Sequence, residues 1–454
     1  MRTIVEPKVN IDKLWGKQRS KETEVYRLMR YVLKVDHNDR ILLHNVVTGQ
    51  LIVAEQEEAI MLAKLPMAYN PVMEQLVANH YLVPRDYDEH QQVLNLRTVL
   101  NRLDEAGRNP GITTYTILTT TACNARCYYC YEKGSKIATM TEQTAEDIVT
   151  YIKEHCGPEK KVYITWFGGE PTLASNRITQ ICNGLLREGI KYQSKIVTNG
   201  YLFDESMISD AKNLWKLSFV QICVDGTEKN YNYIKSYVGV KDNPYQRVMR
   251  NIQLLLEAGV RVKLRMNYDM GNYLDYRPLL EEIKERFHGN SMLMISEHPI
   301  IGEHPDREGK VMHGSDSWFE KTMIELDNIA INAGVNRKED QLPCLNYRLC
   351  MAAQDCAVTI TPEGNLVRCP ERFDDSQVTG NVKQGIMDHD LVQSWKRVAD
   401  NEKCRECVLF PKCVTVENCL TSGLCMSYKK WVRDISAQAV CKYRDYRNKN
   451  YGGA

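Results

Sequence analysis

The stretch Thr119-Thr120-Thr121-Ala122-Cys123-Asn124-Ala125-Arg126-Cys127-Tyr128-Tyr129-Cys130-Tyr131 places three cysteines within eight residues, in the pattern CxxxCxxC. A strand-like run, 114–118, comes directly before it, so we expect the cysteines on a loop that leaves the end of a strand. Three thiolates on one short loop can bind three irons of a cubane cluster and leave the fourth iron open to a small-molecule ligand. A zinc knuckle or three unrelated thiols are alternative interpretations of the same pattern.

The composition is that of an ordinary globular protein, with 43% hydrophobic and 26% charged residues in a chain of 454. Such a length accommodates about three domains. The 59 Lys and Arg residues balance 58 Asp and Glu, which argues against a nucleic-acid partner. The chain starts without an apolar signal segment and has no apolar run long enough to span a bilayer, so we expect a cytoplasmic protein without a membrane partner. Sixteen cysteines in a reducing compartment indicate metal binding rather than disulfides.

The first part of the chain reads as a small mixed unit. Residues 1–24 are polar and poorly patterned and are expected to form an arm. The segments that follow are three strand-like runs (26–35, 41–47, 50–53), two helical stretches (55–65, 71–79), a short apolar run (81–84) and a charged linker helix (86–106). This order resembles the winged-helix-like, PqqD-like element of enzymes that modify ribosomal peptides, in which a leader peptide adds as a strand to a sheet edge. A purely structural cap is the alternative.

The central part alternates strand-like and helical segments. The expected strands are 114–121, 161–167, 194–198, 219–224, 260–267 and 292–297, and the clearest helices are 141–155, 176–188 and 245–258. Six such units in sequence predict an α/β fold with a parallel sheet, and six are too few for a closed eight-stranded barrel. We therefore expect an open, partial (β/α)6 barrel of the TIM-like kind, with its functional residues at the carboxyl ends of the strands.

Polar motifs follow the expected strands where this rule places them. The second strand ends in Gly168-Gly169-Glu170-Pro171, in which the glycines allow close approach of the backbone to a ligand and Glu170 can accept hydrogen bonds from an ammonium group. Later strands end in polar residues, namely Asn199, Asp225, Arg265 and Asn267. Asn199 and Asp225 each precede a glycine, and ordinary turn formation explains these two equally well.

Together with CxxxCxxC and the aromatic Tyr129 before its last cysteine, these motifs resemble the radical S-adenosylmethionine (SAM) superfamily. The resemblance implies that Cys123, Cys127 and Cys130 hold a [4Fe-4S] cluster whose open iron chelates SAM. It implies SAM contacts for Tyr129, Gly168, Gly169, Glu170, Pro171, Asn199, Asp225, Arg265 and Asn267, with the amino group at the Gly-Gly-Glu-Pro turn. Arg265 is the candidate for the SAM carboxylate, because a guanidinium can hold a carboxylate with two hydrogen bonds. Cys223 departs from the family, which usually has serine there.

A second group of cysteines occupies residues 344–441, with a hairpin expected at 357–364. Its spacing resembles the SPASM domain, which carries two auxiliary [4Fe-4S] clusters. The resemblance implies one ligand set of Cys350, Cys356, Cys369 and Cys419 and another of Cys404, Cys407, Cys413 and Cys441. Five residues separate Cys413 from Cys419 where the family has three, so Cys419 and Cys425 could exchange roles. A pair of zinc sites is the alternative, since thiolates at C-x2-C spacing also bind zinc.

The two resemblances imply a radical SAM/SPASM peptide maturase with SAM and three [4Fe-4S] clusters as cofactors. Its expected partners are a precursor peptide with a leader and an external one-electron donor of the flavodoxin or ferredoxin type. The expected reaction is hydrogen abstraction from the peptide and closure of a thioether or carbon–carbon crosslink. The alternatives are an anaerobic sulfatase-maturase-like SPASM oxidase, a peptide epimerase, or a metal-stabilised binding protein without turnover. The expected segments are 1–106 (arm, recognition domain and linker helix), 107–304 (partial barrel), 305–343 (bridge) and 344–454 (auxiliary-cluster domain).

Overall fold

A computed structural model describes the chain from residue 1 to residue 441, apart from 17–20, 22, 38–39, 109, 301, 312–317, 319–320, 324, 327–328, 331–341, 401, 414 and 421–439. Most of the expected bridge at 305–343 and the whole environment of Cys425 thus lie outside the described residues. The chain divides into two compact units. The first consists of 1–108, 338–350 and 397–454, and the second of 109–337 and 351–396.

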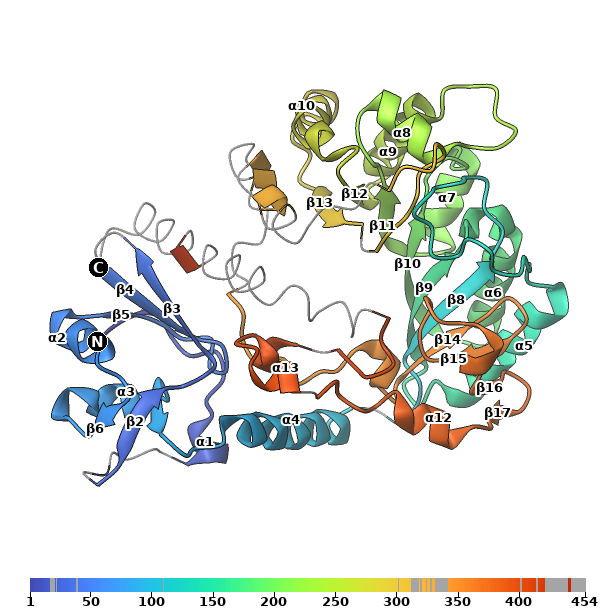
Figure 1. Cartoon of the computed structure of the whole chain (residues 1–454). Coiled ribbons are helices and arrows are strands. Elements are labelled where there is room, and N and C mark those ends of the chain that lie inside the picture. Colours follow the sequence, from blue (N-terminus) through green and yellow to red (C-terminus); the bar gives the residue numbers. More distant parts are fainter. Residues whose placement is uncertain are drawn as a thin grey trace. The chain divides into compact units, whose positions relative to one another are not determined.

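The first unit contains two small antiparallel sheets (Figure 1). One has the order β1-β5-β4-β3 and the other the order β6-β2-β7. Its elements are β1 (Arg2–Val5), α1 (Asp12–Trp15), β2 (Val25–Leu28), β3 (Val32–His37), β4 (Arg40–Asn45), β5 (Leu51–Ala54), α2 (Gln56–Leu62), β6 (Met67–Ala68), η1 (Pro71–Met73), α3 (Glu74–Ala78), β7 (Leu82–Pro84), α4 (Glu89–Ala106), α13 (Glu402–Arg405) and η6 (Phe410–Lys412). The capping box between Glu55 and Glu58 starts α2, and the Asp88 carboxylate caps α4.

Two predictions for this unit were wrong. The arm expected at 1–24 contains β1, which pairs antiparallel with β5. This pairing covers the backbone groups of β5 that would otherwise form an open sheet edge. The single strand expected at 26–35 is two strands, since β2 pairs with β7 while β3 pairs with β4 of the other sheet. The winged-helix-like arrangement stays a prediction.

The second unit is built on one sheet of ten strands in the order β13-β12-β11-β10-β9-β8-β14-β15-β16-β17. Its elements are β8 (Thr114–Thr120), α5 (Glu142–His155), β9 (Lys161–Gly168), η2 (Pro171–Ala174), α6 (Ser175–Arg187), β10 (Lys191–Thr198), α7 (Glu205–Asn213), β11 (Leu217–Cys223), α8 (Glu228–Lys235), α9 (Pro244–Glu257), β12 (Arg261–Tyr268), η3 (Tyr273–Asp275), α10 (Tyr276–Phe287), β13 (Leu293–Pro299), η4 (Met351–Ala353), β14 (Ala357–Ile360), β15 (Asn365–Val367), η5 (Asp375–Gln377), β16 (Gly380–Asn381), β17 (Gly385–Ile386) and α12 (His389–Ser394).

Strands β8 to β13 are parallel neighbours in chain order, which confirms the six predicted strands. On one face of the sheet the buried side chains, such as Val162, Ile164 and Trp166 of β9, join a core formed with α5, α6, α9 and α10. Figure 1 shows α5, α6 and α7 along one side of β8, β9 and β10. The strands therefore bury one face under helices and leave the alternate side chains on the other face.

The hairpin predicted at 357–364 is present as β14 and β15, with Gly364 in the left-handed conformation of its turn. The sequence did not predict that β14 adds to the ten-stranded sheet, where it runs parallel to β8. By its contacts, the expected auxiliary-cluster segment is shared between the units, with 351–396 in the second and 397–454 in the first. The four predicted domain boundaries stay a prediction. None of the helices in the described part of the chain is long and apolar enough to cross a membrane.

Candidate active site

The three cysteines of the CxxxCxxC loop line a single cavity of about 510 Å³ at the carboxyl end of β8. Gly169, which follows the neighbouring strand β9, lines the same cavity. The loop is held by its backbone, since the Arg126 amide donates to the Lys235 carbonyl at 2.7 Å and the Val238 amide donates to the Asn124 carbonyl at 2.8 Å. The volume is within the range of about 300–1,000 Å³ that small-molecule and cofactor sites occupy.

The donor set of this cavity fits an iron–sulfur cluster. Burial raises the pKa of Cys123 to about 12 and that of Cys127 to about 11, and it also raises the pKa of Cys130. Buried thiols of this kind ionise when a cation binds them, which couples their deprotonation to metal binding. Among the described residues, no three His, Cys, Asp or Glu side chains converge as ligands of one metal ion. Convergence on one point is not what a cubane needs, because its cysteines bind separate irons.

The Gly-Gly-Glu-Pro turn packs against the cysteine loop itself. A Cβ at Gly168 would lie 2.1 Å from the Thr120 carbonyl oxygen, and a Cβ at Gly169 would lie 2.4 Å from that of Ala122. The amides of Gly169 and Glu170 donate to these same two carbonyls at 3.0 and 2.9 Å. The glycines are therefore required by close approach of the chain to itself, and their approach to SAM stays a prediction.

The Glu170 carboxylate is fully buried and bound by the protein. Its Oε1 accepts from the Thr198 hydroxyl at 2.7 Å and from the amide and hydroxyl of Thr172, and its Oε2 accepts from the Asn199 amide at 2.7 Å. Pro171 starts η2 directly after it. The Asn199 side chain continues this cluster by donating to Asn124 Oδ1 at 2.7 Å, within the cysteine loop. Glu170 thus joins the ends of β9 and β10, and its contact with the SAM ammonium stays a prediction.

Four other predicted SAM contacts meet in one polar network centred on Asp225, which has no exposed surface. Asp225 Oδ1 accepts from the Asn267 amide at 3.0 Å and from its Nδ2 at 3.1 Å, and Oδ2 accepts from the Tyr129 hydroxyl. Arg265 Nε donates to Asn267 Oδ1 at 2.9 Å. Among the described residues, the terminal nitrogens of Arg265 make no hydrogen bond and no ion pair, so they are available to a carboxylate.

Lys235 belongs to this network, although no sequence motif indicates it. Its ammonium lies 2.7 Å from Asp225 Oδ2 and 3.1 Å from the Tyr129 hydroxyl, and the residue is only 3% exposed. Burial by itself lowers the pKa of Lys235, but the Asp225 carboxylate outweighs it and raises this pKa well above its usual value. A lysine at the end of a polar helix carries no local signal of burial, so only the folded chain reveals the pair.

The expected auxiliary ligands are distributed over both units. The first set has Cys350 and Cys419 in the first unit and Cys356 and Cys369 in the second, so its convergence stays a prediction. The second set, Cys404, Cys407, Cys413 and Cys441, lies wholly in the first unit. Cys425 lies outside the described residues.

The loop that carries Cys404, Cys407 and Cys413 is attached to α4. The guanidinium of Arg97, which is 4% exposed, donates to the carbonyls of Phe410, Pro411 and Cys413 and stacks over the Phe410 ring at 4.7 Å. Phe410 of this loop thus packs in the core of the first unit.

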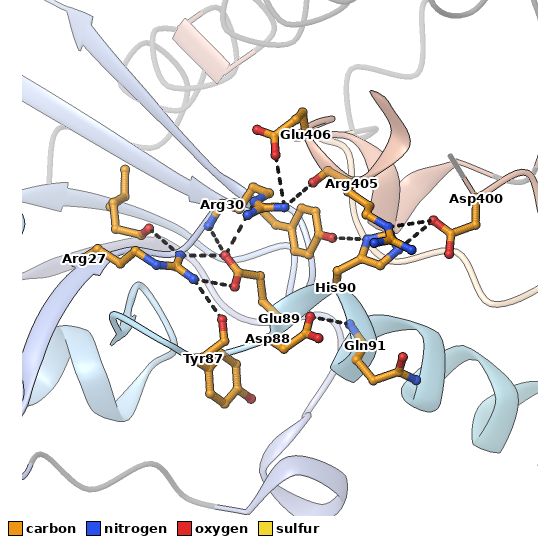
Figure 2. A network of polar contacts seen from close by, with 12 residues as sticks. Arg27, Arg30, Tyr87, Asp88, Glu89, His90, Gln91, Asp400, Arg405 and Glu406 are labelled. Carbon is orange, nitrogen blue, oxygen red and sulfur yellow. Dashed lines mark hydrogen bonds and ion pairs between the residues drawn. The ribbon is translucent and has the colours of Figure 1, made fainter. Parts of the chain in front are cut away.

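A second group of polar contacts joins β2, the turn that follows it and α4 to this C-terminal segment (Figure 2). Glu89 of α4 holds Arg27 by two hydrogen bonds of 2.7 Å. Arg30 donates to the Arg405 carbonyl at 2.6 Å, and His90 lies 2.8 Å from Asp400. The strand β2 and its turn, the helix α4 and one predicted cluster loop therefore pack together in the first unit.

Comparisons with known proteins agree with this site. Residues 117–284 match the family model of the Radical SAM superfamily. The solved structure "Native anSMEcpe with bound AdoMet" is 18% identical, with a TM-score of 0.57 over 73% of this chain and all of that one, and the same protein with AdoMet and a Cp18Cys peptide has the same TM-score over 74% of this chain and 99% of that one. Streptococcus suis SuiB bound to precursor peptide SuiA is 13% identical, with a TM-score of 0.51 over 86% of this chain and 94% of that one. At these identities the structures show a shared fold. The chain therefore contains a radical SAM domain and is an enzyme, which excludes the binding protein without turnover.

Proposed function

We propose that this enzyme is a radical SAM peptide maturase that removes a hydrogen atom from a ribosomally made precursor peptide and installs a thioether or carbon–carbon crosslink. The observation that carries the proposal is the shared cavity of Cys123, Cys127, Cys130 and Gly169 at the carboxyl end of a parallel sheet. Three thiolates beside a glycine turn supply the ligands of a cluster and, next to it, room for a small molecule.

The cysteines of the loop would hold a [4Fe-4S] cluster, and the two sets in 350–441 would hold two auxiliary clusters. When bound, clusters and SAM supply the 5′-deoxyadenosyl radical that takes the hydrogen atom and an acceptor for the electron released on crosslinking. The protein's own residues bind and orient. The terminal guanidinium nitrogens of Arg265 would hold the SAM carboxylate, and the network of Tyr129, Asp225, Lys235 and Asn267 fixes the ends of β11 and β12 around it.

A peptide as the substrate is supported by two solved structures with this fold that contain peptides, anSMEcpe with Cp18Cys and SuiB with SuiA. Because residues 109–454 make up about three quarters of the chain, a match that covers 86% also includes part of 1–108. We propose that the first unit recognises the leader of the precursor by strand addition at β1 or β3, the edge strands of its four-stranded sheet. A flavodoxin- or ferredoxin-type protein would supply the electron.

The first test measures iron, sulfide and electron paramagnetic resonance on protein purified without oxygen, for wild type and a Cys123→Ala/Cys127→Ala/Cys130→Ala variant. We expect about twelve irons per chain in the wild type and about eight in the variant, as four irons per cubane require. About four irons in the wild type, or zinc in the second set, would refute the auxiliary clusters. Failure of the reduced wild type to cleave SAM would refute the proposal as a whole.

A sulfatase-maturase-like oxidase is the second candidate, because the anSMEcpe structure matches over its whole length. The modified peptide distinguishes this oxidase from the crosslinking enzyme. In tandem mass spectrometry, a crosslink suppresses fragmentation between the two joined residues, whereas an oxidised or epimerised single residue leaves the fragment series complete. A complete series from a modified precursor would favour the oxidase or the epimerase over the crosslinking enzyme.

A further inference from the structure

The face of the parallel sheet that is turned away from the helices carries a concentration of positive charge. Strand register places alternate residues of β9 to β13 on this face, since Lys161 pairs with Lys191, Lys195 with Phe219, Phe219 with Arg261 and Arg265 with Ser296. Its charged members are Lys161, Lys191, Lys195, Arg261, Lys263 and Arg265, which we call the basic face. The residues between them, such as Val162 and Val262, lie in the core on the opposite side.

The basic face is not neutralised within the described residues. These strands place no Asp or Glu on it, and none of its six cations has an acidic partner in the part of the chain that the structure describes. Glu297 of β13 points to the other face and accepts from the Tyr276 hydroxyl, and Glu188, just before β10, pairs with Lys153 at 2.7 Å. In a chain with 59 basic and 58 acidic residues, such segregation indicates an external anion.

The local electrostatics agree with uncompensated charge. Burial and the neighbouring Arg265 lower the pKa of Lys263. Burial, Arg265 and Lys263 likewise lower the pKa of His298, which lies at the end of β13 and makes a hydrogen bond of 2.9 Å to the Pro299 carbonyl. Both groups thus experience positive charge that no carboxylate among the described residues offsets.

The basic face extends from the Asp225 network toward the amino ends of the strands. Arg265 lies at the carboxyl end of β12, beside the Asp225 network, while Lys161 and Lys191 lie at the amino ends of β9 and β10. The register puts about eight residues of strand between these two levels, or roughly 26 Å at about 3.3 Å per residue. An extended peptide of about eight residues spans the same distance.

We infer that the basic face binds an acidic segment of the substrate peptide, within about eight residues of the position from which hydrogen is removed. The inference rests on the proposed function, because it assumes that the substrate is a peptide. Carboxylates at alternate positions of an extended peptide face one side and can meet successive cations of the basic face. Arg265 is reserved for SAM in this arrangement, and the exposed lysines at the amino ends are the peptide contacts.

The test uses the full chain with its clusters and a labelled peptide of about ten alternating Glu and Gly residues, compared with a Gln–Gly peptide of equal length. The variant is Lys161→Glu/Lys191→Glu/Lys195→Glu, whose positions are exposed and contact neither the cysteine cavity nor the Asp225 network. The matched control is Lys212→Glu/Lys229→Glu/Lys284→Glu, at exposed positions on the helices α7, α8 and α10. Fluorescence anisotropy at about 0.05 and about 0.3 M salt gives the affinities.

We expect wild type and control to bind the Glu peptide more tightly than the Gln peptide, with weaker binding at high salt. The reversal variant is expected to lose at least about tenfold in affinity, since each exposed pair contributes a few-fold and three are reversed together. Equal binding of the Glu peptide by wild type and the reversal variant would overturn the inference. Tighter binding of a thymidine oligonucleotide than of the Glu peptide would also overturn it, in favour of a nucleic acid.

A separate measurement keeps this inference apart from the proposed function. Cleavage of SAM by the reduced enzyme, without peptide, is expected to be the same in the reversal variant and in wild type. Intact SAM cleavage together with no preference for the Glu peptide would sink the acidic-peptide inference alone. Absence of SAM cleavage in the wild type would sink the proposed function, whatever the peptide affinities.

Discussion

The buried pair of Lys235 and Asp225 gives a sharp test of the site, through the substitution Lys235→Met. The change keeps most of the aliphatic side chain and removes the ammonium that lies 2.7 Å from Asp225 Oδ2. Asp225 then remains a carboxylate without exposed surface, held by the Tyr129 hydroxyl and by the two Asn267 donors.

The expected cost follows from these remaining contacts. Removing one partner of a buried ion pair costs about 3–5 kcal/mol, because it leaves an uncompensated charge. Three hydrogen-bond donors still face Asp225, so we place the loss at the lower end, about 3 kcal/mol, which corresponds to roughly 150-fold in an equilibrium constant. Adding Asp225→Asn removes the stranded charge, and the double variant is therefore expected to recover most of the loss.

Hydrogen exchange in β12 measures this cost locally, because the Asn267 amide donates to Asp225 at 3.0 Å. We expect protection of this strand end to fall by up to roughly 150-fold in the Lys235→Met variant, with weaker SAM binding in equilibrium dialysis. Lys229→Met, on the exposed side of the same helix, is the control and should change neither quantity. Unchanged exchange in Lys235→Met, or a double variant as unprotected as the single one, would refute the role of the pair.

Three further predictions concern other parts of the chain. Burial lowers the pKa of His44 from 6.5 to about 4. As pH falls, the unfolded chain therefore binds the proton first, so the free energy of unfolding is at its full value above pH 6.5 and decreases as pH falls toward 4. We expect urea unfolding to show a loss of about 2 kcal/mol between pH 7 and 5, which His44→Asn abolishes. Gly169→Ala should lower iron content because its Cβ would lie 2.4 Å from a carbonyl oxygen, while Gly107→Ala, whose Cβ would have its nearest neighbour at 3.5 Å and whose φ is −85°, should not; equal iron in both would contradict the packing argument. Arg97→Gln removes charged donors from the Phe410 loop at a cost of about 2 kcal/mol and should speed thiol labelling of that loop; unchanged labelling would show that the loop is held otherwise.

Local pattern was sufficient for much of the second unit. Alternation of apolar residues predicted strands β8 to β13, and α5, α6 and α9 were predicted to within one or two residues at their ends, because strand and helix periods are written in neighbouring residues. The same holds for the cysteine loop and the Gly-Gly-Glu turn, which follow adjacent strands and meet where parallel strands end. Four of the predicted SAM contacts also share one network for this reason.

Other features were decided only by contacts between distant parts of the chain. The pairing of β1 with β5 and of β14 with β8 satisfies open sheet edges, and an edge accepts any strand of suitable shape, so sequence pattern does not specify the partner. The burial of Lys235 beside Asp225 likewise depends on where α8 ends relative to β11. The sequence by itself determined which elements form and which chemistry the cysteines can support. The tertiary structure decided which edges pair, which charges are buried together and which cations lack an acidic partner among the described residues, because these depend on burial and Coulomb energies summed over residues far apart in the chain.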